Sequence, residues 1–304
     1  DRGDVVEFDV RAQLHAPRGA VAVRLGRGGD VRRRADGERL GRVEASLSAG
    51  RTRASASGAF GRAGDVLVAK VASPDLAPLG NAFGIAIAGR VEGDARVEGT
   101  FAAPSGRLAL AAANLALPGG ARLAAFDAKL ALGAAQDSPL SGDVTLAGLR
   151  AGGAGQDGDA LVTRATLRLR GTRAAHDIRL EAALPGESAV RFLLAGGLPV
   201  AAGASPQWRG RLETLESTGR FPAALVSPAS LVVAPDRFEL GEARIAGEWG
   251  RIELATTRWT PALVEAKGVA RGLAVRTVTR LLRLRQAPSS NLVLDAAWGL
   301  RAGE

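Results

Sequence analysis

Polar and apolar residues alternate along much of this chain. In residues 91–101, apolar or small residues occupy the odd positions, among them Val91, Val97 and Phe101, whereas charged or hydroxyl residues occupy the even positions. A helix would distribute these residues around its circumference, whereas a β-strand places alternate residues on opposite faces. The pattern therefore predicts strands with one apolar face and one charged face.

The same alternation recurs in other parts of the chain and predicts an all-β fold. It is clearest in residues 6–14, 41–47, 161–170, 178–182, 208–213 and 251–254. Segments rich in Gly, Pro, Asp and Asn separate these runs, as is typical of tight turns. We expect roughly 15 to 20 strands, spaced about 8 to 14 residues apart.

Helical periodicity is limited to short segments. Val275, Val278 and Leu281 lie on one side of a predicted short helix, with arginines on the other side. A second helical turn is predicted for residues 74–79, and a third for residues 221–227. We expect these pieces at the ends or the mouth of the sheet.

The apolar face of such a sheet must be covered. The cover is a second sheet, closure of the sheet into a barrel or solenoid, or a non-protein ligand. The apolar positions are mostly Ala, Val, Leu and Gly, with only 8 Phe and 4 Trp in the chain, so they would fill a thick core poorly and line a narrow channel well. Two faces of Ala and Leu can also pack on each other, so the residues leave the choice open. The last third contains all the tryptophans, which suit either the wet edge of an apolar groove or a core: Trp208, Trp249, Trp259 and Trp298.

The net charge of +9 does not predict a nucleic-acid partner. The 40 Lys and Arg residues are scattered among 31 acidic residues, and only three of them are lysines. Proteins that bind nucleic acids also need aromatic stacking platforms, whereas aromatic residues make up 4% of this chain and Tyr is absent. The lack of Cys excludes disulfides and thiolate metal sites, and it fits an oxidising compartment.

No motif in the sequence predicts catalysis, a metal or a cofactor. Residues 153–158 match GxGxxG, but a strand-like pattern follows where a dinucleotide site requires a helix, which favours a loop. His15 and His176 have no second His or Cys nearby, so we expect both at the surface or at strand ends. GxSxG, SxxK and HExxH motifs are absent. The carboxylates fall on the solvated strand faces, so we expect a non-enzymatic protein.

Short elements containing Gly, Trp and Leu follow one another along the chain. They include Gly93…Gly99, Gly171–Thr172, Trp208–Gly210, Gly247–Gly250, Trp259–Pro261 and Leu292–Trp298. Their order resembles the middle of the TamB family, the translocation and assembly module proteins that belong with the AsmA-like, bridge-like lipid-transfer group. The resemblance covers nearly the whole chain. Because the sequence starts at Asp1, contains no Met and lacks the family's membrane anchor and C-terminal domain, we expect a middle fragment.

The resemblance implies an elongated, antiparallel, solenoid-like "β-taco" with a U-shaped apolar groove and a few short helices. Residues 1–304 would form one continuous segment of this groove, with a soft boundary near residues 151–159. The family context implies a periplasmic segment of an inner-membrane-anchored protein of a Gram-negative bacterium, with a role in autotransporter assembly. It also implies an Omp85-type, TamA-like partner in the outer membrane, bound through a region outside this fragment.

Three functional hypotheses follow. In the first, phospholipid acyl chains lie along the apolar strand faces, where each buried CH₂ contributes about 0.8 kcal/mol without any specific polar contact. The residues predicted to line this groove are Val91, Val97, Phe101, Leu167, Leu169, Leu180 and Leu212. In the second, exposed strand edges pair with the β-strands of a client protein, as in a folding chaperone. In the third, the segment is a passive spacer between two membranes.

Overall fold

The computed structural model describes residues 21–25, 40–49, 51–101, 103–152, 159–198, 207–281 and 291–303. These residues form twenty strands, two short α-helices and one 3₁₀ helix, which confirms the all-β prediction. The alternating segment at residues 6–14, His15 and the glycine-rich segment at residues 153–158 lie outside the described residues. The chain divides into two compact units, residues 1–164 and residues 165–304.

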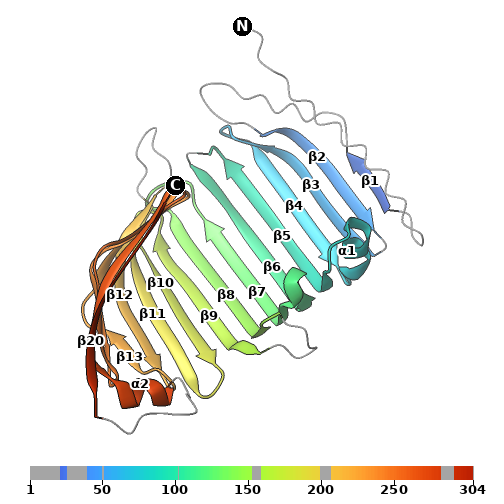
Figure 1. The fold of residues 1–304 in the computed structure, drawn as a ribbon. Coiled ribbons are helices and arrows are strands. Elements are labelled where there is room, and N and C mark those ends of the chain that lie inside the picture. The colour runs from blue at the N-terminus through green and yellow to red at the C-terminus, as the bar shows by residue number, and fades with distance from the viewer. Residues whose placement is uncertain are drawn as a thin grey trace. The chain divides into compact units, whose positions relative to one another are not determined.

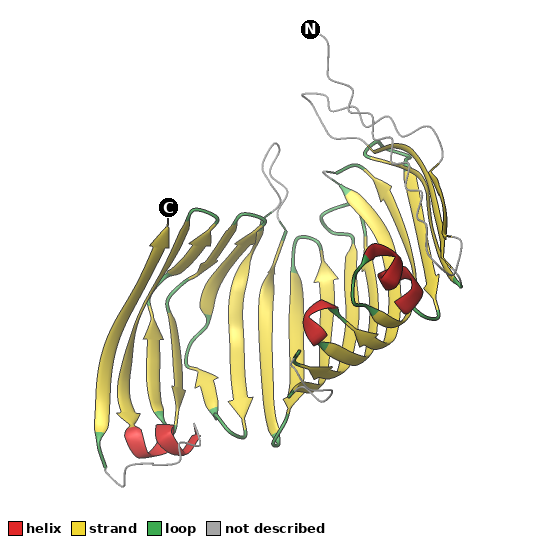
Figure 2. Ribbon diagram, turned by 45° about the vertical axis from the view of Figure 1, so that its right-hand side comes forward, coloured by secondary structure: helices red, strands yellow, loops and turns green. Residues whose placement is uncertain are grey.

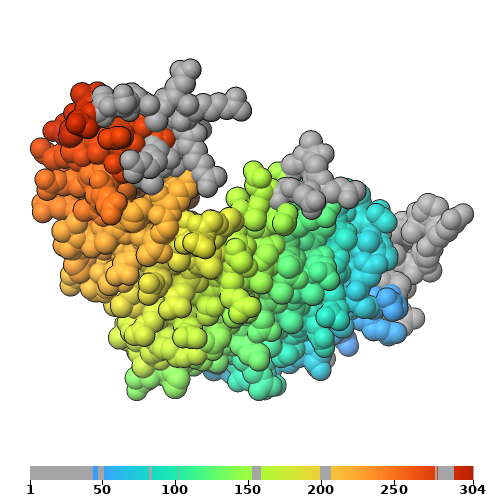
Figure 3. Space-filling view, turned by 90° about the horizontal axis from the view of Figure 1, so that it is seen from below, coloured from blue at the N-terminus to red at the C-terminus, as the bar shows by residue number. Residues whose placement is uncertain are grey.

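Unit 1 is an antiparallel meander, in which each strand from β1 to β7 pairs with the next one along the chain. The strands lie side by side (Figures 1 and 2), and they follow one another as bands of changing colour in the space-filling view (Figure 3). The elements are β1 (Val21–Leu25), β2 (Leu40–Ala49), β3 (Thr52–Phe60), β4 (Val66–Ser73), α1 (Ala77–Phe83), β5 (Ala88–Gly99), β6 (Pro104–Ala116), η1 (Pro118–Gly120), β7 (Arg122–Leu132) and β8 (Pro139–Arg150).

Strand β9 (Ala160–Thr172) crosses the boundary between the units, and the remaining elements belong to unit 2. The predicted boundary at residues 151–159 falls just before this strand. The elements of unit 2 are β10 (His176–Leu184), β11 (Ser188–Gly197), β12 (Trp208–Thr218), β13 (Ala223–Leu225), β14 (Ala229–Ala234), β15 (Arg237–Leu240), β16 (Ala243–Gly247), β17 (Gly250–Leu254), β18 (Thr257–Thr260), β19 (Leu263–Ala274), α2 (Val275–Leu281) and β20 (Val293–Gly303).

Unit 2 is also a meander, but three of its long strands are interrupted in the middle. Strands β13 and β14 both pair with β12, at its two ends. Next in the sheet, β16 and β15 together form a second interrupted strand, in which β16 pairs with β13 and β15 pairs with β14. Strands β17 and β18 form a third, which pairs with β16 and β15 on one side and with the two ends of β19 on the other. The interruptions therefore lie at the same level in three neighbouring strands.

The helices agree in part with the sequence predictions. Helix α2 lies where a one-sided apolar pattern predicted it, whereas α1 begins at Ala77, three residues later than predicted. The carboxylate of Asp75 accepts a hydrogen bond from the Ala77 backbone N–H (2.9 Å), so the chain is still in a turn at that point.

The prediction of a third helix, at residues 221–227, is wrong. Strand β13 occupies this segment and pairs with β12 on one side and β16 on the other. The Val226 N–H then donates to the Arg244 carbonyl oxygen at 2.7 Å. Pairing on both sides satisfies the backbone in an extended conformation, so it overrides the local helical pattern.

Candidate functional site

The strand register gives unit 1 one face of apolar side chains, which we call the apolar face of unit 1. Residues directly opposite each other in neighbouring strands belong to the same face, so they form rows that cross the strands. Four rows cross the strands β3–β8 or β4–β8: Ala54, Val71, Gly93, Leu110, Ala128 and Val144; Ala56, Ala69, Ala95, Leu108, Leu130 and Gly142; Gly58, Leu67, Val97, Gly106, Leu132 and Leu140; and Ser73, Val91, Ala112, Phe126 and Leu146.

Few of these apolar side chains are fully buried. Among the described side chains of unit 1, the fully buried hydrophobic ones are Phe60, Ala112, Leu123 and Ala128. Most others in the rows are half-buried, and Leu130 keeps 37% of its surface exposed. A fully packed protein core would cover such residues almost completely.

Helix α1 adjoins one end of this face. There the hydroxyl groups of Thr52 and Ser73 lie 2.7 Å apart, and both side chains are buried. Thr52 also donates to the carbonyl oxygen of Asp75 at 3.2 Å. The apolar rows therefore end in a polar pair whose hydrogen bonds are satisfied internally.

Unit 2 has a corresponding apolar face. One row contains Leu180, Phe192 and Leu215 from β10, β11 and β12. A second row contains Leu225, Ile245, Ile252, Ala270 and Ala296 from β13, β16, β17, β19 and β20. Several bulky side chains of this unit remain well exposed, among them Phe238, Trp259, Trp298 and Leu300.

Six of the seven residues predicted to line a groove lie within strands and are half-buried. They are Val91 and Val97 in β5, Leu167 and Leu169 in β9, Leu180 in β10 and Leu212 in β12. The expected strand position of Phe101 is wrong. Strand β5 ends at Gly99, whose φ of 89° turns the chain, so Phe101 lies in the following connection. Its ring, 46% exposed, lies edge-on against Phe60 with the centroids 4.8 Å apart.

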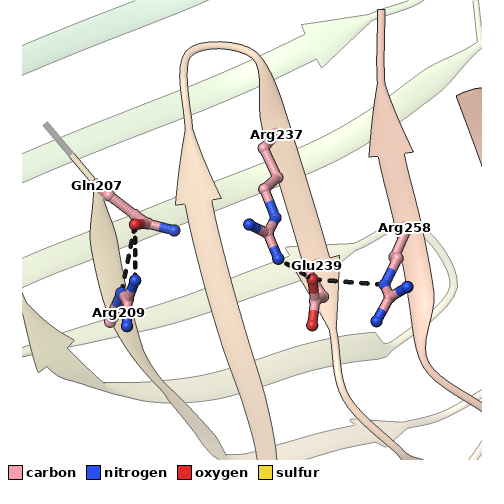
Figure 4. A network of polar contacts seen from close by, with 5 residues as sticks. All are labelled: Gln207, Arg209, Arg237, Glu239 and Arg258. Carbon is pink, nitrogen blue, oxygen red and sulfur yellow. Dashed lines mark hydrogen bonds and ion pairs between the residues drawn. The ribbon is translucent and has the colours of Figure 1, made fainter. Parts of the chain in front are cut away.

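The opposite face of unit 2 carries paired charges. Glu239 of β15 lies between Arg237 of the same strand and Arg258 of β18, as Figure 4 shows; the Arg258 Nε is 3.5 Å from the Glu239 carboxylate. A hydrogen bond from Arg237, together with the charge of both arginines, lowers the pKa of Glu239 below its ordinary value, against a smaller opposing effect of burial. The hydrogen bond from Lys267 likewise lowers the pKa of Glu265.

The charged face of unit 1 has a hollow that the sequence did not predict. Its volume is about 1110 Å³, and its lining includes Arg53, Lys70, Asp94, Arg107 and Lys129. Ala72, Ala109 and Ala111 also border it. Short side chains among long charged ones leave this space, and the register places Ala109 directly between Asp94 and Lys129.

His176 is the first residue of β10, so of the two positions predicted for it, the surface or a strand end, it has the second, and 6% of its surface is exposed. Its Nε2 accepts a hydrogen bond from the indole Nε1–H of Trp208 at 2.9 Å. Trp208 is itself 9% exposed and lies in the core, whereas Trp259 and Trp298 are exposed. The interpretation of the tryptophans as core residues therefore holds for Trp208 and not for Trp259 and Trp298.

The chemistry of the described residues is that of two surfaces, one apolar and one charged. Within the described ranges, no three His, Asp or Glu side chains come together as a metal site would require. None of the helices in the described part of the chain has the length and apolar character needed to cross a membrane. Comparison of the chain with protein-family models, curated proteins and solved structures gave no match.

Proposed function

We propose that the apolar faces of the two units bind the acyl chains of phospholipids and serve as a path for lipid movement. The observation that supports this most is the half-exposed state of the apolar rows, exemplified by Leu130 in unit 1 and by Trp298 and Leu300 in unit 2. A broad apolar surface on a protein in water indicates a binding site for an apolar partner.

The rows favour a long, flexible ligand. Each row takes one residue from each of several consecutive strands, so an acyl chain along a row would meet a new residue of the apolar face at every strand, about 4.8 Å apart. Burial of each CH₂ contributes about 0.8 kcal/mol, and no polar contact is needed to hold the chain.

The wider context rests on the resemblance to the TamB family. We propose that this chain is a periplasmic segment of an inner-membrane-anchored protein, and that it carries phospholipids between the inner and outer membranes. A TamA-like protein of the Omp85 type would be its outer-membrane partner. The two-faced strands fit this role, because the charged face would stay in water while the apolar face holds the acyl chains.

Site-specific photo-crosslinking tests the proposal. A photoreactive residue is placed at Val97 or Leu169 on the apolar faces, with matched controls at Arg96 and Arg168, which are the preceding residues of the same strands. Since neighbours in a strand point to opposite faces, only the first pair should give phospholipid adducts in membranes or with added vesicles. Adducts that are absent at Val97 and Leu169, or equally abundant at Arg96 and Arg168, would refute the proposal.

A second candidate function is templating of client strands, which the exposure of β20 favours. All eleven residues of this strand are exposed, and among the described strands it pairs only with β19. Its other edge could pair with the strand of a client. The substitutions Val97→Asp and Leu169→Asp separate the two functions, because a carboxylate on the apolar face should block lipid binding and leave pairing at the edge of β20 intact.

A further inference from the structure

The contacts of His176 assign a hydrogen-bonding role to each imidazole nitrogen. An indole N–H can only donate, so Nε2 of His176 must be the acceptor of the 2.9 Å bond from Trp208. The proton of a neutral imidazole then lies on Nδ1, which is 2.9 Å from the carbonyl oxygen of Thr172 and donates to it. Both ring nitrogens are therefore satisfied only in the neutral form.

Two glycines provide the surface on which the indole lies. A Cβ atom added to Gly196 of β11 or to Gly210 of β12 would come within 2.5 Å of the Trp208 ring. The register places His176 opposite Gly196, and Gly196 opposite Gly210, so the three residues form one row on the apolar face of unit 2. The indole therefore covers the backbone at the position where this row would otherwise be open.

A hollow at the surface of unit 2 borders His176. The hollow is bordered by His176, Asp177, Gly197 and Arg209 and has a volume of about 400 Å³. The charged residues next to the pair along the chain are Arg173 in the turn before β10, Asp177 in β10 and Arg209 in β12, and the register brings Arg211 into the row of Asp177. The Asp177 carboxylate is 3.8 Å from Arg179, and the Arg209 guanidinium donates to the side chain of Gln207.

We propose that His176 and Trp208 form a proton-controlled latch on the apolar face of unit 2. Protonation of His176 adds a hydrogen to Nε2, which then faces the indole N–H as a second donor, so the hydrogen bond to Trp208 is lost. The indole leaves its position over Gly196 and Gly210 and uncovers the backbone of both residues. The role of this opening, admission of an acyl chain at acidic pH, rests on the proposed lipid-binding function.

The latch is tested without lipid by the tryptophan fluorescence of the full chain between pH 7.5 and 5.0. We expect a one-proton transition to longer emission wavelength and stronger acrylamide quenching, with the far-UV circular dichroism unchanged. The transition should be lost in His176→Gln, which keeps an uncharged acceptor, and in Trp208→Phe, and it should persist in His15→Gln.

The latch is refuted by the absence of a transition in the wild type, by its persistence in His176→Gln, or by its coincidence with a loss of the β-sheet circular dichroism. Quenching of the fluorescence by brominated phosphatidylcholine at both pH values then addresses the lipid separately. If the spectral transition occurs but the lipid quenches at neither pH, the latch stands and the proposed lipid function fails.

Discussion

Replacing Leu130 with Ala in β7 tests whether the apolar face of unit 1 is open to solvent. Leu123 lies in the same strand and provides the matched control, because it is 8% exposed whereas Leu130 is 37% exposed. The two Leu→Ala changes remove the same atoms from the same strand. Any difference in their cost therefore reflects how well each position is covered.

The expected costs follow from the buried surface. Leu→Ala removes three carbon atoms, worth about 2.4 kcal/mol at about 0.8 kcal/mol each when fully buried. A little under two-thirds of Leu130 is covered, which gives about 1.5 kcal/mol, and the open side leaves no closed cavity to add to it. For Leu123 the transfer and cavity contributions together give about 3 kcal/mol.

Urea unfolding followed by far-UV circular dichroism measures both costs. All four tryptophans lie in unit 2, so tryptophan fluorescence reports the unfolding of that unit alone. A transition that appears in the circular dichroism and not in the fluorescence therefore belongs to unit 1. Bound phospholipid should raise the cost of Leu130→Ala by about 1 kcal/mol, since it would cover the remaining third of the leucine, and leave that of Leu123→Ala unchanged. Equal costs for the two variants without lipid would refute the open face.

Further predictions concern a turn, the charged face and lipid binding. Gly58→Ala should cost about 3 kcal/mol or more in urea unfolding, because the φ of Gly58 is 121° and an added Cβ would lie 1.9 Å from the Val66 carbonyl oxygen. Gly64→Ala should cost about 1 kcal/mol, because Gly64 has a φ of 85° and free space around it. Because the folded-state pKa of Glu239 is lowered, its ion pairs stabilise the fold above the unfolded pKa of about 4.3, and this contribution is lost as the pH falls through the folded-state pKa. Glu239→Gln should therefore lower the unfolding free energy by about 0.2–1 kcal/mol at pH 7 and have no effect at pH 2; an equal effect at both values would contradict this account. Val97→Asp should lower phospholipid binding in a vesicle co-sedimentation assay at least tenfold, whereas Arg96→Asp should not, and similar losses in both would show that charge alone governs binding.

The period-two alternation was sufficient to predict the strands and to sort their faces. Val91 and Val97 lie on the apolar face because side-chain direction in a strand depends only on position along it. Phe101 departs from this pattern because Gly99 adopts a positive φ and ends the strand. Glycine can adopt a positive φ but need not, so the sequence alone does not predict the end of the strand here.

Features that depend on register across several strands could not be predicted. His176 and Trp208 are 32 residues apart, and β11 lies between their strands, so their hydrogen bond depends on the register of two successive pairings. The hollow on the charged face of unit 1 likewise depends on which short residues line up across neighbouring strands, as Ala109 does with Lys129. Single-strand periodicity contains no information about either alignment.

Backbone irregularities line up across neighbouring strands in both units. In unit 1, Gly89 (φ 113°), Asn114 (φ 52°) and Gly148 (φ 66°) lie at the same level of β5, β6 and β8. An irregularity confined to one strand would shift its register and turn its apolar residues to the charged face. The pairing of β6 with β7 and of β7 with β8 keeps one register on either side of this level, as the pairing of Leu123 with both Leu115 and Leu149 illustrates. The pairing of β5 with β6 instead shifts by one residue between Ala88 and Arg90, as at a β-bulge. The interruptions in unit 2 at residues 226–228, 241–242 and 255–256 also lie at one level of three neighbouring strands. Each such line of irregularities runs parallel to the rows, in the direction in which the proposed acyl chains would lie.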